Sequence, residues 1–238
     1  MDLQDRVALV TGGTGALGSA IVLDLLASGA RVAATYTVEP EWHHLSSRAG
    51  VSRSRLKGIP ADLTEADDVR TAVRSLQNVH GRIDFLLAIA GAFAAGKIHE
   101  TSEAVWDRMM DLNLKTLFSV LRPVIPIMIE QNFGRIVTVS SGAILSGPGA
   151  GIAAYAVSKA AVRHLSEILA EEVKGYNIRV QCLMPGTMDT EANRRAMPMA
   201  DPSRWVKTDE VARVVHRLLL DGADSPLVVP ILQPGTPT

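Results

Sequence analysis

The segment Val7-Ala8-Leu9-Val10-Thr11-Gly12-Gly13-Thr14-Gly15-Ala16-Leu17-Gly18 decides the fold class of this chain. Four apolar residues, which are typical of a buried strand, lead through a glycine-rich turn into a stretch whose large apolar residues recur at helical spacing. A strand, a tight turn and a helix in that order bring backbone N–H groups and a helix N-terminus close to a phosphate. We therefore expect a dinucleotide to bind here, with Gly12 in the turn and Gly18 where helix and strand pack closely.

Apolar runs and longer amphipathic segments alternate along the rest of the chain. The predicted strands are residues 7–10, 31–35, 58–62, 83–90, 135–140, 178–184 and 227–229, and the predicted helices are residues 16–28, 64–79, 102–131, 153–174 and one beginning at Thr208. Residues 39–57 are polar and irregular and carry only a weak helix pattern. The alternation predicts an α/β fold, a Rossmann-type, doubly wound and mostly parallel sheet with helices on both faces in three α/β/α layers.

No internal repeat, low-complexity tract or linker divides the 238 residues. We expect a single domain over residues 1–238, in which the Met-, Pro- and Arg-rich segment at about 187–206 closes over the substrate as a lid. Thr64 is expected to open the helix at 64–79, and Pro123 and Pro126 to bend the helix at 102–131.

Composition excludes several classes of function. The formal net charge is −1 and hydrophobic residues make up 47%, so disorder is excluded and binding to nucleic acid through a broad basic patch is not expected. The single cysteine, Cys182, excludes an internal disulfide framework and a multi-cysteine metal cluster, and it fits a reducing cytoplasm. His43 and His44 are adjacent, so their side chains point apart, and no metal site is expected.

One uncharged stretch, Ile136–Ser158, has the length of a membrane span. Four serines and four glycines lie within it, and Gly147-Pro148-Gly149 interrupts any helix. A buried strand followed by a loop is therefore predicted instead. The apolar run Val7–Val10 is also too short for the core of a signal peptide. We expect a cytoplasmic protein with no membrane segment.

The second predicted strand ends without the acidic residue that would bind the adenosine ribose. Because no carboxylate at Tyr36 would repel a 2′-phosphate, the sequence favours NADP(H) over NAD(H). No Arg or Lys occurs in the glycine-rich turn, so Thr37 is the expected hydrogen-bond donor to that phosphate. The other candidates, from the following segment, are His43, His44 and Arg48.

Further ligand contacts are expected where other strands end. Asp62 follows the third predicted strand, and Ala90-Gly91 follows the fourth, at the edge where ligands bind in open α/β sheets. Asp62 would accept hydrogen bonds from an adenine amino group or from neighbouring backbone N–H groups. The alternative is that Asp62 only caps the turn at Thr64.

Tyr155 and Lys159 lie four residues apart, which places both side chains on one face of a predicted helix. A nearby ammonium lowers the pKa of a tyrosine, and a tyrosine so tuned can exchange a proton with a carbonyl or alcohol. Ser141 ends the preceding strand, where its hydroxyl can hydrogen-bond a substrate oxygen. Asn113 lies in a predicted helix, which it can disturb, and its amide can hold a water. Pro185-Gly186 follows the sixth strand, where a turn would cover a nicotinamide.

Taken in order, these motifs resemble the short-chain dehydrogenase/reductase family over nearly the whole chain. The resemblance rests on the Thr11–Gly18 turn, Asp62, Ala90-Gly91, Asn113, Ser141, Tyr155-x-x-x-Lys159 and Pro185-Gly186-Thr187. It implies an NAD(P)(H)-dependent oxidoreductase acting on a small carbonyl or alcohol substrate, with Tyr155 as general acid and base. It also implies that Lys159 binds the nicotinamide ribose and lowers the Tyr155 pKa, that Ser141 orients the carbonyl and that Asn113 holds a water in a proton relay.

The resemblance also implies a homodimer or homotetramer built through two long helices. The residues expected to bind the cofactor are Gly12, Thr14, Gly15, Ala16, Leu17, Gly18, Tyr36, Thr37, Asp62, Leu63, Ala90, Gly91, Tyr155, Lys159, Pro185, Gly186, Thr187 and Met188.

Three departures from the family pattern bear on these expectations. Ala16 stands where the family usually has glycine, and Ala88-Ile89-Ala90-Gly91 replaces its usual Asn-Asn-Ala-Gly. Ser141 lies one residue farther from Tyr155 than is most common, so Ser140 is a rival. The Gly12–Ser19 and Leu183–Pro198 segments also resemble dihydropteridine reductases. A quinonoid dihydropteridine is therefore the alternative substrate, and a nucleotide-sensing protein without turnover is the alternative from another class.

Overall fold

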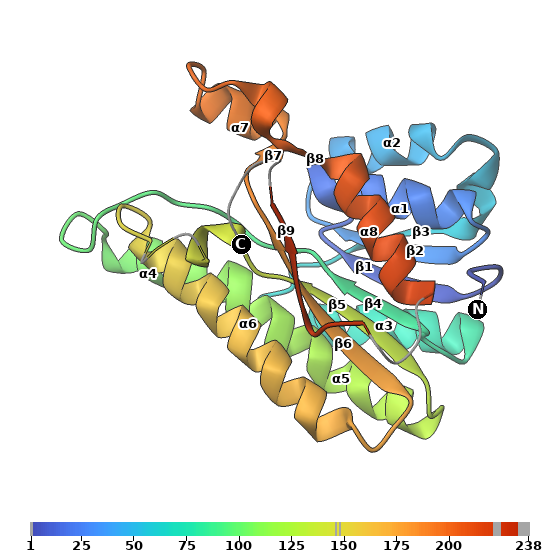
Figure 1. Ribbon diagram of the computed structural model, residues 1–238. Helices are drawn as coiled ribbons and strands as arrows, with labels where there is room; N and C mark the ends of the chain where they lie inside the picture. Colours follow the sequence, from blue (N-terminus) through green and yellow to red (C-terminus); the bar gives the residue numbers. More distant parts are fainter. Residues whose placement is uncertain (1, 146, 148, 221–224, 233–238) are drawn as a thin grey trace.

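The structure, a computed structural model, describes residues 2–145, 147, 149–220 and 225–232. At its centre lies a seven-stranded sheet in the order β3-β2-β1-β4-β5-β6-β9, in which every neighbouring pair is parallel (Figure 1). The strands are β1 (Val7–Thr11), β2 (Arg31–Tyr36), β3 (Leu56–Pro60), β4 (Phe85–Ala88), β5 (Gly134–Val139), β6 (Ile178–Pro185) and β9 (Val228–Ile231). The strand order reverses between β1 and β4, and a ligand crevice is expected at the carboxyl ends there.

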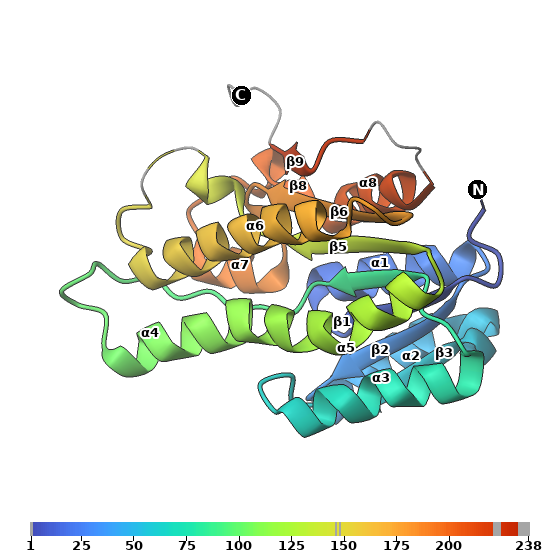
Figure 2. The same cartoon turned by 90° about the horizontal axis from the view of Figure 1, so that it is seen from below.

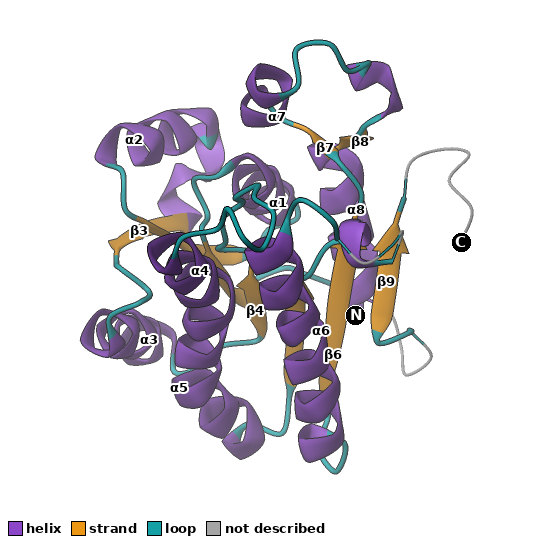
Figure 3. Ribbon diagram, turned by 90° about the vertical axis from the view of Figure 1, so that its left-hand side faces the viewer, coloured by secondary structure: helices purple, strands orange, loops and turns teal. Residues whose placement is uncertain are grey.

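Helices cover both faces of the sheet, which confirms the predicted three-layer arrangement (Figure 3). One face carries α1 (Ala16–Ala27), α2 (Glu39–Arg48) and α8 (Thr208–Leu220). The other carries α3 (Ala66–His80), α5 (Thr116–Glu130) and α6 (Ala153–Val173), which run along the sheet in Figure 2. Because both faces are covered, β4 and β5 are buried along their whole length, as their apolar runs predict.

The segment 39–57, predicted to be irregular, instead forms α2 and a 3-10 helix, η1 (Gly50–Arg55). The reason is burial of the only two large apolar residues on this polar helix, Trp42 and Leu45. The Trp42 ring stacks on Tyr36 at the end of β2, with 5.4 Å between the ring centroids. Tertiary packing therefore outweighs the weak local pattern, and β3 begins at Leu56 rather than at residue 58.

One helix prediction needs correction. The helix expected from Thr64 begins at Ala66, because Thr64 instead donates two hydrogen bonds to Asp62 Oδ1 through its backbone N and its Oγ1. The long helix expected over 102–131 is confirmed as a continuous helix over Glu103–Glu130, in which a π-helical turn at Asp111–Lys115 separates α4 (Glu103–Met110) from α5. The departure from α-helical geometry thus lies at the π turn, while Pro123 and Pro126 lie inside α5.

The predicted lid, residues 187–206, contains more regular structure than expected. It holds β7 (Met188–Asp189), α7 (Glu191–Ala196), η4 (Pro202–Arg204) and the first residue of β8 (Val206–Lys207). β7 and β8 pair in parallel, and the segment stands away from the main sheet above β6 (Figure 1).

The uncharged stretch 136–158 is not one helix. Its described residues form most of β5, the short 3-10 helix η3 (Gly142–Ile144), a loop and the first turns of α6, as predicted; Ser146 and Pro148 lie outside the described residues. A different run, Glu103–Glu130, is long and apolar enough to cross a membrane by length and composition alone. About 44% of its most apolar part is buried within the fold, and buried core helices pass the same test.

A buried carboxylate anchors the amino edge of the sheet. Asp84, just before β4, is fully buried and accepts a hydrogen bond from the backbone N of Val7 at 2.9 Å. Its carboxylate also pairs with Arg6 at 3.0 Å and with Arg82. The interactions join the starts of β1 and β4, the two central strands.

We expect Asp84→Asn to lower the free energy of unfolding by about 3 kcal/mol, because it leaves two guanidinium groups without their buried counter-charge. Urea denaturation followed by circular dichroism measures this. The control is Asp67→Asn, which removes an exposed Arg70 partner and should change stability by less than about 0.5 kcal/mol. Equal effects of the two substitutions would contradict the assignment.

Candidate functional site

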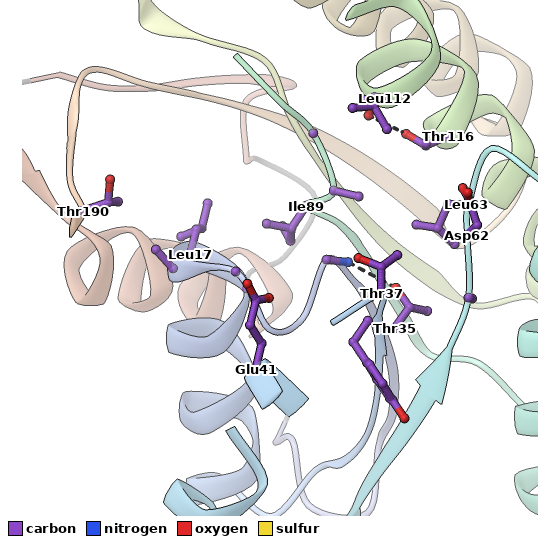
Figure 4. A pocket seen from close by; sticks show the side chains of 18 of the residues that line it. Leu17, Thr35, Thr37, Glu41, Asp62, Leu63, Ile89, Leu112, Thr116 and Thr190 are labelled. Atoms are coloured by element: carbon purple, nitrogen blue, oxygen red, sulfur yellow. Dashed lines mark hydrogen bonds between the residues drawn. The ribbon is translucent and has the colours of Figure 1, made fainter. Parts of the chain in front are cut away.

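A cleft of about 390 Å³ opens at the carboxyl edge of the sheet, where the strand order reverses (Figure 4). Twelve of the residues expected to bind a cofactor line it: Gly12, Gly15, Ala16, Leu17, Gly18, Tyr36, Thr37, Asp62, Leu63, Ala90, Gly91 and Met188. Thr14, Tyr155, Lys159, Pro185, Gly186 and Thr187 are not part of this lining. The lining also includes residues that the sequence analysis did not single out: Thr35, Glu41, Ala61, Ile89, Leu112, Thr116 and Thr190.

The glycine-rich turn is held by hydrogen bonds to the ends of both neighbouring strands. Gly12 N donates to Thr35 Oγ1 at 3.2 Å, and Thr11 Oγ1 accepts from the backbone N of Ile89 and Ala90. Gly12 has a φ of +61°, the left-handed region that favours glycine. A Cβ on Gly18 would collide with the carbonyl oxygen of Gly12. Both glycines therefore have the backbone roles that their spacing predicts.

The charges around the cleft differ from those expected. Glu41, in the first turn of α2, points toward the start of α1 (Figure 4). Its Oε2 accepts a hydrogen bond from Thr14 Oγ1 of the glycine-rich turn at 2.9 Å. Neither His43, His44 nor Arg48 lines the cleft. The only charged residues in the described lining are the acids Glu41 and Asp62. Glu41 was missed because only the folding of residues 39–48 into a helix brings it to the turn.

Asp62 stabilises the turn that follows β3. Its Oδ1 accepts hydrogen bonds from the backbone N and the Oγ1 of Thr64, at 2.9 and 2.7 Å, and these bonds lower the pKa of the carboxyl. The turn-capping alternative is thus observed. Asp62 also lines the cleft, so its contact with an adenine stays a prediction.

A second cluster, formed by Ser141, Tyr155 and Lys159, joins the end of β5 to α6. Lys159 is 6% exposed, its Nζ donates to the carbonyl of Val139 at 2.9 Å, and it lies 6.0 Å from the Tyr155 ring centroid. Ser141 hydrogen-bonds the Tyr155 side chain, whereas Ser140 Oγ donates to the backbone carbonyl of Lys159 at 2.7 Å. The structure therefore places Ser141, and not its rival Ser140, beside the tyrosine.

The pKa of Tyr155 is shifted in the direction opposite to that expected. Burial raises the Tyr155 pKa, and the hydrogen bond with Ser141 only partly offsets this effect. The Lys159 ammonium, which was expected to lower this pKa, donates its hydrogen bond to the Val139 carbonyl instead. Burial also lowers the pKa of Lys159 to about 8.

Asn113 joins the two parts of the site. It is 2% exposed in the π turn, where its Oδ1 accepts from Ala92 N at 2.8 Å and its Nδ2 donates to Ala92 O at 3.1 Å and to Ser158 Oγ at 2.9 Å. A Cβ on Gly91 would come within 2.6 Å of Asn113 Oδ1 and 3.1 Å of Lys159 Nζ. Gly91, which lines the cleft, therefore lies against both side chains.

The segment after β6 packs beside Ser141. A Cβ on Gly142 would lie 3.1 Å from the carbonyl of Pro185 and 3.2 Å from Gly186 N, so these two turns are in close contact.

Farther along the chain, Asp189 binds Arg194 at 2.6 Å and also pairs with Lys207, and both cations lower the pKa of Asp189. Arg194 is thus held by an internal acid at the base of the lid. No group of three or more metal-ligating side chains was found in the described ranges.

Lys159→Met tests the cost of burying this ammonium. The folded-state pKa of about 8 lies below the unfolded value, so the folded protein binds fewer protons between about pH 8 and pH 10 and gains stability as pH rises through that range. Below pH 8 both states are protonated and the full penalty remains. We expect the free energy of unfolding of the variant to exceed that of the wild type by about 1 kcal/mol at pH 7. This figure is what remains of the burial penalty after the loss of the Val139 hydrogen bond is subtracted.

The difference in Tm between Lys159→Met and the wild type should shrink between pH 8 and pH 10, as measured by differential scanning calorimetry. Lys97→Met, which removes an ammonium whose side chain is 65% exposed, is the matched control. A difference that stays constant or widens with pH would contradict the burial cost.

Comparison with known proteins supports one family. The model of the short chain dehydrogenase family matches residues 6–201. The 3-oxoacyl-[acyl-carrier-protein] reductase FabG of Thermotoga maritima is 31% identical over 229 residues, covering 93% of each chain. The acetoacetyl-CoA reductase of an Acinetobacter species is 35% identical over 188 residues, covering 77% of this chain and 74% of the relative.

Solved structures agree with this match. The crystal structure of gox2181 has a TM-score of 0.88 at 29% identity and covers 97% of this chain and 95% of its own. A short-chain type dehydrogenase/reductase from Mycobacterium ulcerans has a TM-score of 0.88 at 26% identity, and the match covers 97% of this chain and 89% of that protein. Together with the family match, these similarities establish that the chain belongs to the short-chain dehydrogenases/reductases, a family of NAD(P)-binding oxidoreductases.

Proposed function

We propose that this protein is an NAD(P)(H)-dependent oxidoreductase that transfers a hydride between nicotinamide and a carbonyl or alcohol carbon, with Tyr155 as the general acid and base. The observation that carries the proposal is the cluster of Ser141, Tyr155 and Lys159 next to the cleft. Gly91 connects the cleft with the cluster, since Gly91 lines the cleft and lies against Lys159. The proton-transferring group is therefore close to the place where a nicotinamide would end.

The cleft fits a dinucleotide by its backbone. A Cβ on Gly12 would meet the backbone of Ala90 at 2.9 Å, so the turn and the end of β4 form one close wall. Backbone N–H groups of this turn and the N-terminus of α1 would hold the pyrophosphate. The turn from Pro185 to Met188 would cover the nicotinamide, and Lys159 would bind its ribose. When bound, the dinucleotide supplies or accepts the hydride.

The protein's own groups would manage the proton. In the reductive direction Tyr155 Oη donates its proton to the carbonyl oxygen, and the Ser141 hydroxyl hydrogen-bonds the same oxygen as negative charge develops there. A buried tyrosine resists ionisation, so it is held in the donor form until a cation compensates the phenolate. Lys159 is the nearest candidate, once its Nζ turns from Val139 O toward the ribose and the tyrosine.

Asn113 would act by positioning. Its amide already binds Ala92 and Ser158, so we propose that it holds the π turn and α6 in register, while a water at the backbone of this turn completes the proton relay. We also propose that residues 187–206 form the substrate lid of a single domain, 1–238, and that the enzyme is a cytoplasmic homodimer or homotetramer.

A 3-oxoacyl thioester, in which the ketone lies β to the thioester carbonyl, is the substrate class that two of the relatives favour. Two of them are named for reduction of 3-oxoacyl-[acyl-carrier-protein] and of acetoacetyl-CoA. We propose a panel that begins with acetoacetyl-CoA and includes simple ketones, with quinonoid dihydropteridine as the alternative substrate. A nucleotide-sensing protein would bind the dinucleotide and turn over none of them.

The form of the cofactor is the second part of the proposal. The sequence favours NADP(H), because no acid stands at Tyr36. The charge of the cleft argues the other way, since Glu41 lies beside Thr14 in the turn and no cation lines the described cleft. A carboxylate there accepts ribose hydroxyls and repels a 2′-phosphate. We therefore propose NAD(H) as the favoured form and Glu41 as the residue that sets the preference.

Tyr155→Phe removes only the phenolic hydroxyl. We expect a loss of about 10²–10⁴-fold in kcat on the reactive member of the panel, because general acid catalysis is lost. Binding of NADH, followed by its fluorescence, should be unchanged. The control is Tyr176→Phe at an exposed tyrosine. Full activity of Tyr155→Phe would refute the assignment of the proton donor.

Glu41→Gln tests the form of the cofactor. Removing this charge should improve kcat/KM for NADPH relative to NADH by about fivefold, which corresponds to the roughly 1 kcal/mol between two unit charges about 4 Å apart in water. Steady-state kinetics with both cofactors measure the ratio. Glu39→Gln makes the same change in the same helical turn but outside the cleft, and it should leave the ratio within about twofold. A wild type that prefers NADPH would overturn the choice of NAD(H), and equal effects of the two variants would overturn the role of Glu41.

A further inference from the structure

A second hollow lies at the opposite edge of the sheet from the dinucleotide cleft. It is formed where β2 and β3 begin and where α3 ends, and its volume is about 290 Å³. These elements neighbour one another at one side of the molecule (Figures 1 and 2). The volume is close to the lower limit of small-ligand pockets, which usually begin at about 300 Å³.

The lining of this hollow is basic. Arg31, Arg55, Lys57 and His80 all contribute to it, and no Asp or Glu does. One carboxylate lies nearby: Asp5 pairs with Arg31 at 2.9 Å and is close enough to Arg55 for the two charges to interact. A protein with a net charge of −1 thus concentrates three permanent cations around a single hollow.

Two of these cations, Lys57 and Arg55, hydrogen-bond to neutral oxygens. Lys57 Nζ hydrogen-bonds the hydroxyl of Ser75 at 2.5 Å, and Arg55 Nη2 donates to Leu26 O at 2.8 Å and to Ser52 Oγ at 3.0 Å. Neither forms a salt bridge with a carboxylate in the part of the chain that the structure describes. The Arg55 Nε is moreover buried with no hydrogen-bond acceptor among the described residues. That atom is too buried to reach a ligand, whereas the exposed Lys57, whose hydrogen bond goes to a neutral hydroxyl, keeps donors for an acceptor from outside the chain.

His80 responds to the same positive field. Its pKa is lowered by burial first and then by the charges of Arg31 and Lys57. His80 lies in the last turn of α3, where the helix dipole by itself would favour the protonated imidazole. The charges of Arg31 and Lys57 nevertheless lower the pKa of His80. This direction agrees with a net positive charge in the hollow.

Apart from Ser54 and Ser75, the remaining residues that line the hollow are apolar. Leu76 is 1% exposed and lines it from α3, and Val79, one turn later on that helix, is 61% exposed. Val32 and Leu56 line it from the starts of β2 and β3. A group of cations beside an apolar wall is suited to an anion that carries an apolar or aromatic part.

We propose that this basic hollow binds a small organic phosphate, whose phosphate is held by Lys57 and Arg31 on the α3 side of the sheet and whose apolar part lies on Val79 and the edge of Leu76. Arg31 offers a planar set of donors and Lys57 a point charge, both of which suit phosphate oxygens. The site is independent of the proposed oxidoreductase site, whose described lining is charged only by acids. The proposal therefore stands whether or not the cofactor assignment is correct.

Isothermal titration calorimetry of the full chain with phenyl phosphate tests the proposal. We expect one site, and we expect Lys57→Glu to weaken binding at least about tenfold, since it replaces a favourable charge by a repulsive one. The matched control is Arg74→Glu, which reverses an exposed charge on α3 outside the hollow and should change the affinity less than about twofold. Circular dichroism checks that both variants are folded, and the milder Lys57→Gln replaces Lys57→Glu if that variant is not.

The ligand series separates the parts of the site. Phenol, which lacks the phosphate, should not bind, and benzoate, with one charge, should bind more weakly than phenyl phosphate. Absence of phenyl phosphate binding to the wild type overturns the proposal, as do equal effects of the substitutions at positions 57 and 74. Binding that survives Lys57→Glu and is displaced by NADH places the phosphate in the other cleft and also overturns it. NADH titration of the wild type reports separately on the proposed function.

Discussion

One buried amide connects the parts on which the site depends. Asn113 occupies a π turn between α4 and α5, and its side chain binds both backbone groups of Ala92 and the hydroxyl of Ser158. It thereby ties the loop after β4, which forms one wall of the cleft, to the helix that carries Tyr155 and Lys159. A buried amide with unsatisfied groups costs about 1–3 kcal/mol, so these bonds favour one arrangement of the three elements. The positions of cleft and cluster relative to each other follow from it.

The lysine in the cluster carries a different cost. Lys159 is nearly inaccessible, and its pKa falls to about 8 because burial penalises the ammonium. Its main compensation in the structure is the hydrogen bond with the Val139 carbonyl. Because one hydrogen bond offsets only part of the cost of burying the ammonium, a second oxygen, from a ribose or a phenolate, would stabilise it further. The site therefore gives up stability that a methionine would restore, an exchange often found where function needs a strained group.

The parallel sheet gives the molecule two chemically different edges. At the carboxyl edge, backbone N–H groups of a glycine-rich turn face a cleft whose described charges are Glu41 and Asp62. At the amino edge, Asp84 is surrounded by guanidinium groups, and the basic hollow lies between the starts of β2 and β3 and the end of α3. The parallel alignment keeps the two groups of charges apart, because all strand starts meet at one edge and all strand ends at the other; the residues at each edge set the sign. Local charge therefore matters more here than the net charge of −1.

The sequence by itself determined whatever depends on local geometry: the glycine-rich turn, the buried strands, the parallel three-layer order and the shared helix face of Tyr155 and Lys159. It did not determine which of two adjacent serines lies beside the tyrosine, because both follow the last residue of β5 and only the placement of α6 decides that Ser140 bonds its backbone and Ser141 its tyrosine. Tertiary packing alone made α2 a helix and brought Glu41 to the turn, through the burial of Trp42 against Tyr36. The direction of the Tyr155 pKa shift was likewise decided in three dimensions, since residue spacing places charges near one another, whereas burial and hydrogen-bond partners set the energy of those charges.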